Sequence, residues 1–195
     1  MPSPPPAVVL VGRPNVGKST LFNRLTRTRR AIVTAIPGTT RDVIAFDVEW
    51  RGRRVRLVDT GGMFGASEDP LHALVLERGQ RALAEADMLV LVVDGREGLV
   101  PGDRDIARDA RAADRPLLLA INKMDDKKAR AGALDFYQLG IDPIFEISAE
   151  HGEGVGDLLD GILDALPGAP PATYSSETGH GCCTSDSRGP RGRLF

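Results

Sequence analysis

The sequence predicts an α/β fold with a mostly parallel sheet, because short apolar runs alternate with stretches of helical periodicity along most of the chain. One pair of neighbouring segments instead alternates apolar with charged residues, as the strands of an antiparallel hairpin with one wet face do. The chain has 195 residues, of which 42% are hydrophobic and 27% charged. This suffices for one ordinary domain and excludes a collagen, a coiled coil and a wholly disordered chain.

Apolar runs bounded by Gly, Asp, Asn, Pro or Ser are expected to form strands that are buried on both faces. These runs are residues 7–11, 88–93, 117–121 and 144–147. The predicted hairpin pairs residues 43–50 with a strand around Val55 and Leu57, and Gly52 lies in its turn.

Helical periodicity lies between these strands, at residues 21–25, 71–86 and 155–166. The alternation predicts one domain over residues 7–167. We expect residues 1–6, which are mostly proline, and residues 168–195, which are rich in Gly, Ser, Thr and Pro, to be disordered.

Composition narrows the possible partners. The net charge of −2 is too balanced to argue for or against nucleic acid. The longest apolar run, residues 88–93, is far shorter than the roughly twenty residues of a membrane-spanning helix. No secretory signal is visible, so we expect a cytoplasmic protein that does not bind membranes. We also expect Cys182, Cys183 and His180 to bind nothing, because adjacent cysteines fit neither a disulfide framework nor a zinc site.

A phosphate-binding loop is predicted directly after the first strand. Residues 12–19 match the pattern Gly-x-x-x-x-Gly-Lys-Ser and open a helical stretch, which is the context that this pattern requires. Backbone amides and the start of the helix favour a phosphate there. We expect Lys18 to reach the β- and γ-phosphates and Ser19 to bind magnesium. The predicted nucleotide-binding residues are Gly12, Arg13, Pro14, Asn15, Val16, Gly17, Lys18, Ser19 and Thr20.

A second motif, at the end of a buried strand, favours guanine as the base. The carboxylate of Asp125 can accept from both N1–H and the exocyclic amine of guanine, whereas adenine would leave it unpaired. The stem of Lys123 can lie along the base plane. A backbone amide after the last strand can reach the guanine oxygen. The predicted base-binding residues are Asn122, Lys123, Met124, Asp125, Ser148 and Ala149.

A third motif, at the end of the second strand of the hairpin, is expected to contribute to the magnesium shell and to contact the γ-phosphate. It offers a carboxylate and a turn of small residues whose amide can touch the γ-phosphate. Its members are Asp59, Thr60, Gly61 and Gly62. A long loop with the sequence Pro-Gly-Thr-Thr-Arg-Asp at residues 37–42 precedes the hairpin, and one of its threonines could close over the metal.

These motifs, in this order and spacing, resemble the translation-factor-related GTPases. Residues 12–20, 37–42, 93–99 and 147–160 resemble, more narrowly, the first G domain of the Der (EngA) family of bacterial ribosome-assembly GTPases. The resemblance covers residues 7 to about 167. It implies a three-layer, six-stranded Ras-like fold, hydrolysis of GTP with magnesium, and a switching role in maturation of the large ribosomal subunit. That subunit and its RNA are the implied partners, and we expect a monomer.

The resemblance also implies roles for individual residues. The implied magnesium ligands are Ser19, Thr40 and Asp59. The implied catalytic residues are Asn15, Lys18, Thr40 and Gly62. Met63 stands where many Ras-like enzymes have a glutamine that orients the attacking water. A potassium ion held by Asn15 is expected to stabilise the phosphates in place of that glutamine, because potassium-activated GTPases share the sequence motif Pro-Asn-x-Gly-Lys-Ser.

The chain departs from that family at residues 124–126, where many relatives differ although Asp125 is present, and in its domains, because family members carry two G domains and a KH-like domain. Residues after Pro167 do not resemble a second G domain, and we expect a truncation or a reading-frame change near residue 170 to account for them. Two other functions stay open: a GTP-binding module that does not hydrolyse GTP, and the G domain of a tRNA-modification GTPase.

Arginines cluster in two segments that the fold could bring together. They either contact RNA phosphates or, in the plainer interpretation, form a solvated helix end and the wet face of the hairpin. They are Arg24, Arg27, Arg29, Arg30, Arg51, Arg53, Arg54 and Arg56. We expect His151 to cap a loop or face solvent rather than to act in catalysis.

Overall fold

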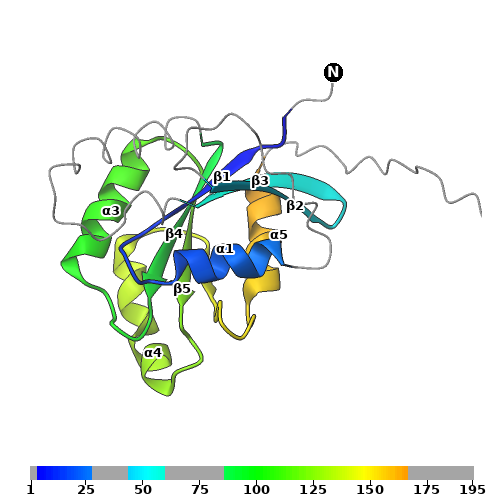
Figure 1. Cartoon of the computed structure of the whole chain (residues 1–195). Coiled ribbons are helices and arrows are strands. Elements are labelled where there is room, and N and C mark those ends of the chain that lie inside the picture. The colour runs from blue at the N-terminus through cyan, green and yellow to red at the C-terminus, as the bar shows by residue number, and fades with distance from the viewer. Residues whose placement is uncertain (1–3, 28–43, 60–85, 167–195) are drawn as a thin grey trace, which may run out of the picture.

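A computed structural model describes residues 4–27, 44–59 and 86–166 of the chain, and every structural statement below concerns these residues. Within them a six-stranded sheet has the strand order β2-β3-β1-β4-β5-β6 (Figure 1). The strands are β1 (Ala7–Val11), β2 (Ile44–Trp50), β3 (Arg53–Asp59), β4 (Met88–Asp94), β5 (Leu117–Asn122) and β6 (Ile144–Glu146).

Only the β2–β3 pair is antiparallel among the described strands, and the remaining pairs are parallel. The predicted fold class is therefore confirmed, including the antiparallel hairpin at the edge of the sheet. Because the parallel strands run the same way, the loops that follow them gather at one edge of the sheet.

Helices cover both faces of the sheet, which gives three layers. They are α1 (Lys18–Thr26), α3 (Pro101–Ala112), α4 (Lys127–Gly132), the 3₁₀ helix η1 (Ala133–Leu139) and α5 (Val155–Ala165). One core cluster joins α1 and α5 to the sheet, and a second joins α3, α4 and η1 to the other face. In Figure 1, α3 and α5 accordingly stand on opposite sides of the strands.

The central strand β4 is buried along its whole length, as its unbroken apolar sequence predicts. The same expectation was wrong for residues 144–146, whereas Ile147, just after the strand, is 1% exposed. Strand β6 ends at Glu146, where the side chain is exposed, and Ile144 and Phe145 are only half-buried. The reason is its position, since β6 pairs only with β5 and forms an edge of the sheet.

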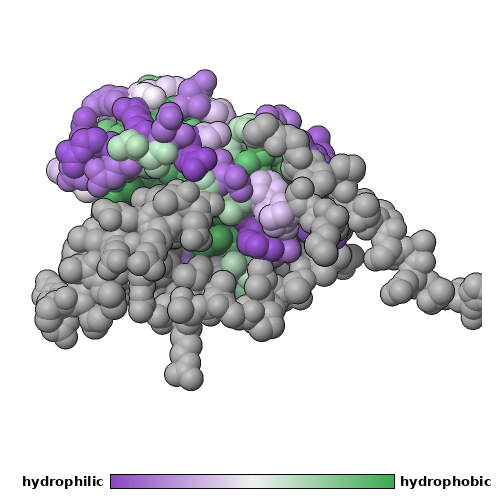
Figure 2. Space-filling model, turned by 90° about the horizontal axis from the view of Figure 1, so that it is seen from above, coloured by the Kyte–Doolittle hydropathy of each residue, from purple (hydrophilic) through white to green (hydrophobic). Residues whose placement is uncertain are grey.

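Helix α3 has a charged sequence that the apolar pattern did not reveal. Its buried residues are Asp103, Ala107 and Ala110, and the outward side is mainly arginine and aspartate. The surface on the α3 side is accordingly mostly hydrophilic (Figure 2). In the described part of the chain no helix is both long and apolar enough to cross a membrane.

Some predicted elements fall outside the described residues. The helical pattern at 71–86 does so except for Ala86, which is buried just before β4 and belongs to no helix. Residues 1–3 and 168–195 also lie outside, so their predicted disorder stays a prediction.

The edge hairpin is joined to α5 by side-chain hydrogen bonds. The indole Nε1 of Trp50 donates to Asp160 Oδ1 at 2.7 Å. Arg53 donates to the carbonyls of Leu163 and Leu166 at 2.8 and 3.2 Å, and so pairs carbonyl groups at the end of the helix. These bonds fix the end of the sheet that carries β2 and β3.

We predict that Trp50→Phe lowers the free energy of unfolding by roughly 1–2 kcal/mol, because it removes a partly buried hydrogen bond to a charged acceptor. Urea denaturation measures the change. Tyr137→Phe is the matched control, since Tyr137 is 60% exposed, and we expect no change for it. Equal free energies of unfolding for the two variants would show that the hydrogen bond from Trp50 to α5 does not stabilise the fold.

Candidate nucleotide-binding site

The predicted motifs meet at the edge of the sheet where the parallel strands end. The phosphate loop follows β1, Asp59 ends β3, Asp94 ends β4 and Asn122 ends β5. The loop of residues 147–154 connects β6 to α5 at the same edge. In an open α/β sheet this edge is where ligands bind.

The phosphate loop needs glycine at both of its ends. Gly12 has φ +147°, and a Cβ there would stand 2.3 Å from the Val92 carbonyl oxygen. Gly17 has φ +97°, and a Cβ there would stand 2.3 Å from Asn122 Nδ2. The loop is thus pressed against both β4 and the base motif, and Lys18 begins α1 immediately after it.

Lys18 is 4% exposed and closes over its own loop. Its Nζ donates to the carbonyls of Gly12 at 2.8 Å and Arg13 at 2.6 Å. Burial lowers the pKa of Lys18, the Asp59 carboxylate opposes this, and the charge of Arg13 adds to the lowering. The structure therefore holds a buried cation in the phosphate loop, close to a buried carboxylate.

Arg13 turns away from the loop toward α3. Its guanidinium pairs with Glu97 at 2.7 Å and with the fully buried Asp103 at 2.8 Å. Burial lowers the pKa of Arg13, but the bonds to Glu97 and Asp103 raise it above its ordinary value. The side chain of Arg13 thus anchors the loop, and the backbone carbonyl of Arg13 accepts the hydrogen bond from Lys18. Neither acidic partner is predicted by the sequence pattern.

Asn122 joins the phosphate loop to the loop after β6. The side chain is 2% exposed; Nδ2 donates to the Val16 carbonyl and Oδ1 accepts from the Ala149 amide, each at 2.9 Å. The predicted role of the Ala149 amide toward guanine stays a prediction, since in this structure that amide donates to Asn122.

Lys123 makes a second connection within the site. Its Nζ donates to the Asn15 carbonyl at 3.0 Å and also to Asp94 at the end of β4. Met124 is 4% exposed and packs in the second core cluster. Of the motif at 122–125, Met124 therefore serves the core, and the other side chains are polar groups at the edge of the sheet.

Asp125 accepts hydrogen bonds at both carboxylate oxygens. Arg96 donates to Oδ2 at 2.6 Å and Ser148 Oγ to Oδ1 at 3.2 Å. Burial raises the pKa of Asp125, but the bonds from Arg96 and Ser148 outweigh it and hold the pKa below its usual range. His151 is exposed, its Nδ1 lies 3.0 Å from Ser148 Oγ, and its amide donates to the same oxygen, so it supports this loop.

Several clustered arginines hold the fold rather than stand free. Arg24 donates to the carbonyls of Ala149 and Glu150, a contact that the sequence pattern does not predict. Arg51 pairs with Asp160, and Arg56 with Asp47. Arg53 likewise has partners within the protein, which neither interpretation predicted, and contact of these arginines with RNA phosphates stays a prediction. Arg29 and Arg30 lie outside the described residues.

The donor set near Lys18 fits magnesium that is held mainly by phosphate and water. In the part of the chain that the structure describes, no group of three or more His, Cys, Asp or Glu could hold a metal ion. Ser19 is exposed in the first turn of α1 and Asp59 is buried at the end of β3. Magnesium commonly takes few protein ligands beside substrate phosphates. Thr40, Thr60, Gly61 and Gly62 lie outside the described residues.

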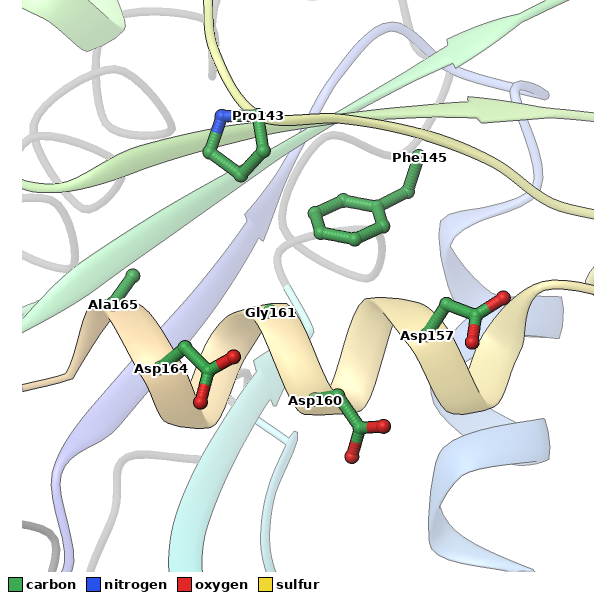
Figure 3. Close-up of a pocket in the computed structure, with 7 residues that line it drawn as sticks. All are labelled: Pro143, Phe145, Asp157, Asp160, Gly161, Asp164 and Ala165. Carbon is green, nitrogen blue, oxygen red and sulfur yellow. The ribbon is translucent and has the colours of Figure 1, made fainter.

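A groove of about 470 Å³ lies elsewhere, between β6 and α5 (Figure 3). Phe145 and Pro143 line it from the strand side, and Asp157, Asp160 and Asp164 from the helix. It contains no residue of the phosphate loop or of the motif at 122–125. The groove is therefore separate from the candidate site.

The sequence profile described as 50S ribosome-binding GTPase matches residues 7–123, which include the phosphate loop and the start of the base motif. The chain belongs to this family. The matched residues include every strand of the sheet except β6.

GTPase Der proteins are similar to most of the chain. Der from Symbiobacterium thermophilum is 48% identical over 163 residues, which is 83% of this chain and 35% of that protein. Der from Moorella thermoacetica is 47% identical over 167 residues, 86% of this chain and 38% of that protein. The resemblance to a Der G domain is thereby confirmed, and the chain spans little more than a third of the length of these relatives.

Solved structures of related GTPases share the fold. Aquifex aeolicus Era bound to GDP and AlF₄⁻ has a TM-score of 0.70 and 29% identity, covering 87% of this chain and 60% of that one. Era in complex with MgGDPNP and nucleotides 1506–1542 of 16S ribosomal RNA has a TM-score of 0.70, 28% identity and coverages of 89% and 60%. The G domain of the T. maritima FeoB iron transporter has a TM-score of 0.62, 26% identity and coverages of 82% and 98%.

We predict that Asn122→Ala lowers the free energy of unfolding by about 2–4 kcal/mol, because it leaves the Val16 carbonyl and the Ala149 amide without their partner. Urea denaturation measures this, and a nucleotide titration should show a parallel loss of GDP binding. Asn23→Ala, at an exposed position on α1, is the control. A variant at Asn122 as stable as the control would show that the bridge contributes little.

Proposed function

We propose that the chain binds GTP with magnesium and hydrolyses it to GDP and phosphate. The observation that carries this proposal is the joining of a phosphate loop to a guanine-type motif through Asn122 and Lys123. Membership of the 50S ribosome-binding GTPase family supports it. The chain spans 35–38% of the Der proteins named above, so the activity of such whole proteins is proposed for it.

Phosphate and metal would be held by residues of the phosphate loop and the end of β3. Lys18 would turn from its carbonyl partners to the β- and γ-phosphates, and Ser19 and Thr40 would bind magnesium directly, with Asp59 acting through water. When bound, magnesium neutralises phosphate charge. The γ-phosphate would order the segments of Thr40 and Gly62, and its loss would release them.

Guanine would be read by Asp125, whose carboxylate lies at the end of the base motif and is 22% exposed. Guanine presents neighbouring N–H donors to a carboxylate, whereas adenine presents an acceptor at N1. An unpaired carboxylate in this pocket penalises adenine by orders of magnitude.

We predict that Asp125→Asn weakens GTP binding roughly 100-fold or more and improves binding of xanthosine triphosphate, whose C2 carbonyl matches the new donor. Fluorescence titrations with both nucleotides measure this. Asp135→Asn is the control, because Asp135 is an exposed aspartate on η1, away from the base motif. Unchanged GTP affinity of Asp125→Asn would refute the assignment.

Asn15 is the proposed support of catalysis, through a potassium ion beside the phosphates. Its backbone is held at φ +65° and its carbonyl accepts from Lys123, whereas its side chain is exposed and no hydrogen bond joins it to the described residues. The amide oxygen is therefore available to a cation or to phosphate. This chain's contribution would be to position that oxygen.

We predict that potassium, compared with sodium at equal ionic strength, accelerates GTP turnover by the wild type several-fold and by Asn15→Ala hardly at all. Phosphate release under multiple turnover measures both rates. Equal rates of the wild type in the two salts would remove the potassium role and leave a residue supplied by a partner as the catalyst. Absence of turnover in both salts, with GTP still bound, would favour the non-hydrolysing alternative.

A switching role in ribosome assembly is proposed from the same relatives. The matching family is described as ribosome-binding, and one Era structure contains ribosomal RNA. We propose the large subunit and its RNA as partner, a cytoplasmic location and a monomeric chain. Co-sedimentation with large subunits in GTP but not in GDP tests the partner, and nucleotide-independent association at low salt would indicate nonspecific attraction to phosphates.

A further inference from the structure

Arg96 lies beside the base motif because the loop after β4 packs directly against that motif. The Gly95 amide donates to the Asn122 carbonyl at 2.8 Å. A Cβ on Gly95 would stand 2.7 Å from the sulfur of Met124. A Cβ there would also stand 3.0 Å from the Asn122 carbonyl oxygen, so glycine suits this close approach, and the backbone places the next side chain, Arg96, next to Asp125.

The Arg96 guanidinium is bonded to the carboxylate that the proposed function assigns to guanine. Its Nη2 donates to Asp125 Oδ2 at 2.6 Å, and Ser148 Oγ donates to the other oxygen at 3.2 Å. Both oxygens of the carboxylate therefore have a donor already. The hydrogen bond to Asp125 also raises the pKa of Arg96.

Guanine and guanidinium present the same kind of edge, which is a row of N–H donors on one planar carbon–nitrogen frame. We propose that Arg96 is a stand-in for the base: its guanidinium and guanine compete for the carboxylate of Asp125, so Arg96 leaves Asp125 when guanine binds. The inference rests on the proposed function, since it takes Asp125 as the guanine-reading residue. Arg96 thus competes with guanine nucleotides and weakens their binding.

The exposure of the two side chains suits such an exchange. Arg96 is 46% exposed and Asp125 22%, so the guanidinium can move into solvent while the carboxylate stays in place. Ser148 holds the carboxylate from its other side, and the surrounding backbone is fixed by the Gly95 amide.

The opposite role for Arg96 would be to support Asp125 by keeping it ionised and oriented. A carboxyl group ordinarily has a pKa of about 4, so Asp125 needs no help to stay ionised at neutral pH. Ser148 already orients it. If Arg96 competes with guanine, its removal strengthens GDP binding; if Arg96 supports Asp125, its removal weakens GDP binding. The two roles can therefore be distinguished.

The test measures GDP affinity by calorimetry, in magnesium buffer, for the wild type, Arg96→Ala and Arg108→Ala. Arg108 is the matched control, because it is 72% exposed and pairs with Asp105 and Asp109 on its own helix. We expect Arg96→Ala to bind GDP roughly two- to fivefold more tightly, the factor that an exposed ion pair supports. Arg108→Ala should bind as the wild type does.

A second comparison locates the effect at the carboxylate. In an Asp125→Asn background the charge that Arg96 pairs with at this position is gone, so Arg96→Ala should change the affinity for xanthosine diphosphate much less than it changes the GDP affinity of the wild type. Equal or weaker GDP binding by Arg96→Ala would overturn the stand-in role, as would the same gain in the Asn background. A wild type that binds no GDP would instead overturn the proposed function itself.

Discussion

The candidate site depends on the buried side chain of Asn122, which joins two loops that are far apart in the sequence. It donates to the phosphate loop at Val16 and accepts from the loop after β6 at Ala149, and these contacts span 106 and 27 residues of chain. A buried amide with unmet hydrogen bonds is strongly unfavourable, so the arrangement that satisfies both of its ends is selected. Gly17 leaves the room for this side chain, because a Cβ there would overlap Nδ2.

The sheet makes that bridge possible. Parallel strands bring the ends of β1, β4 and β5 to one edge, and the alternation of side chains sends one set of residues to the α1–α5 core and the other to the α3–η1 core. Lys123, Arg13 and Arg24 then connect the loops to one another or to a neighbouring helix. The phosphate loop and the base motif are therefore positioned as one unit by the fold.

Local patterns in the sequence predicted most of the strands, the hairpin, the phosphate loop and the base motif, because each depends on neighbouring residues. The contacts that the patterns missed are distant: Arg13 meets Asp103 across 90 residues, and Arg24 meets Ala149 across 125. Burial of residues 144–146 was overestimated because a local apolar run does not reveal an edge position. Helix α3 was missed because Arg and Asp dominate its sequence and leave little apolar periodicity.

Amide hydrogen exchange with and without GDP tests most directly whether these loops form one guanine nucleotide site. The account predicts that GDP slows exchange in residues 12–20, 122–126 and 148–152 together, since Asn122 and Lys123 join them. It also predicts that the same concentration of ADP leaves residues 122–126 and 148–152 unchanged. Protection by GDP confined to residues 12–20, or equal protection by both nucleotides, would contradict it.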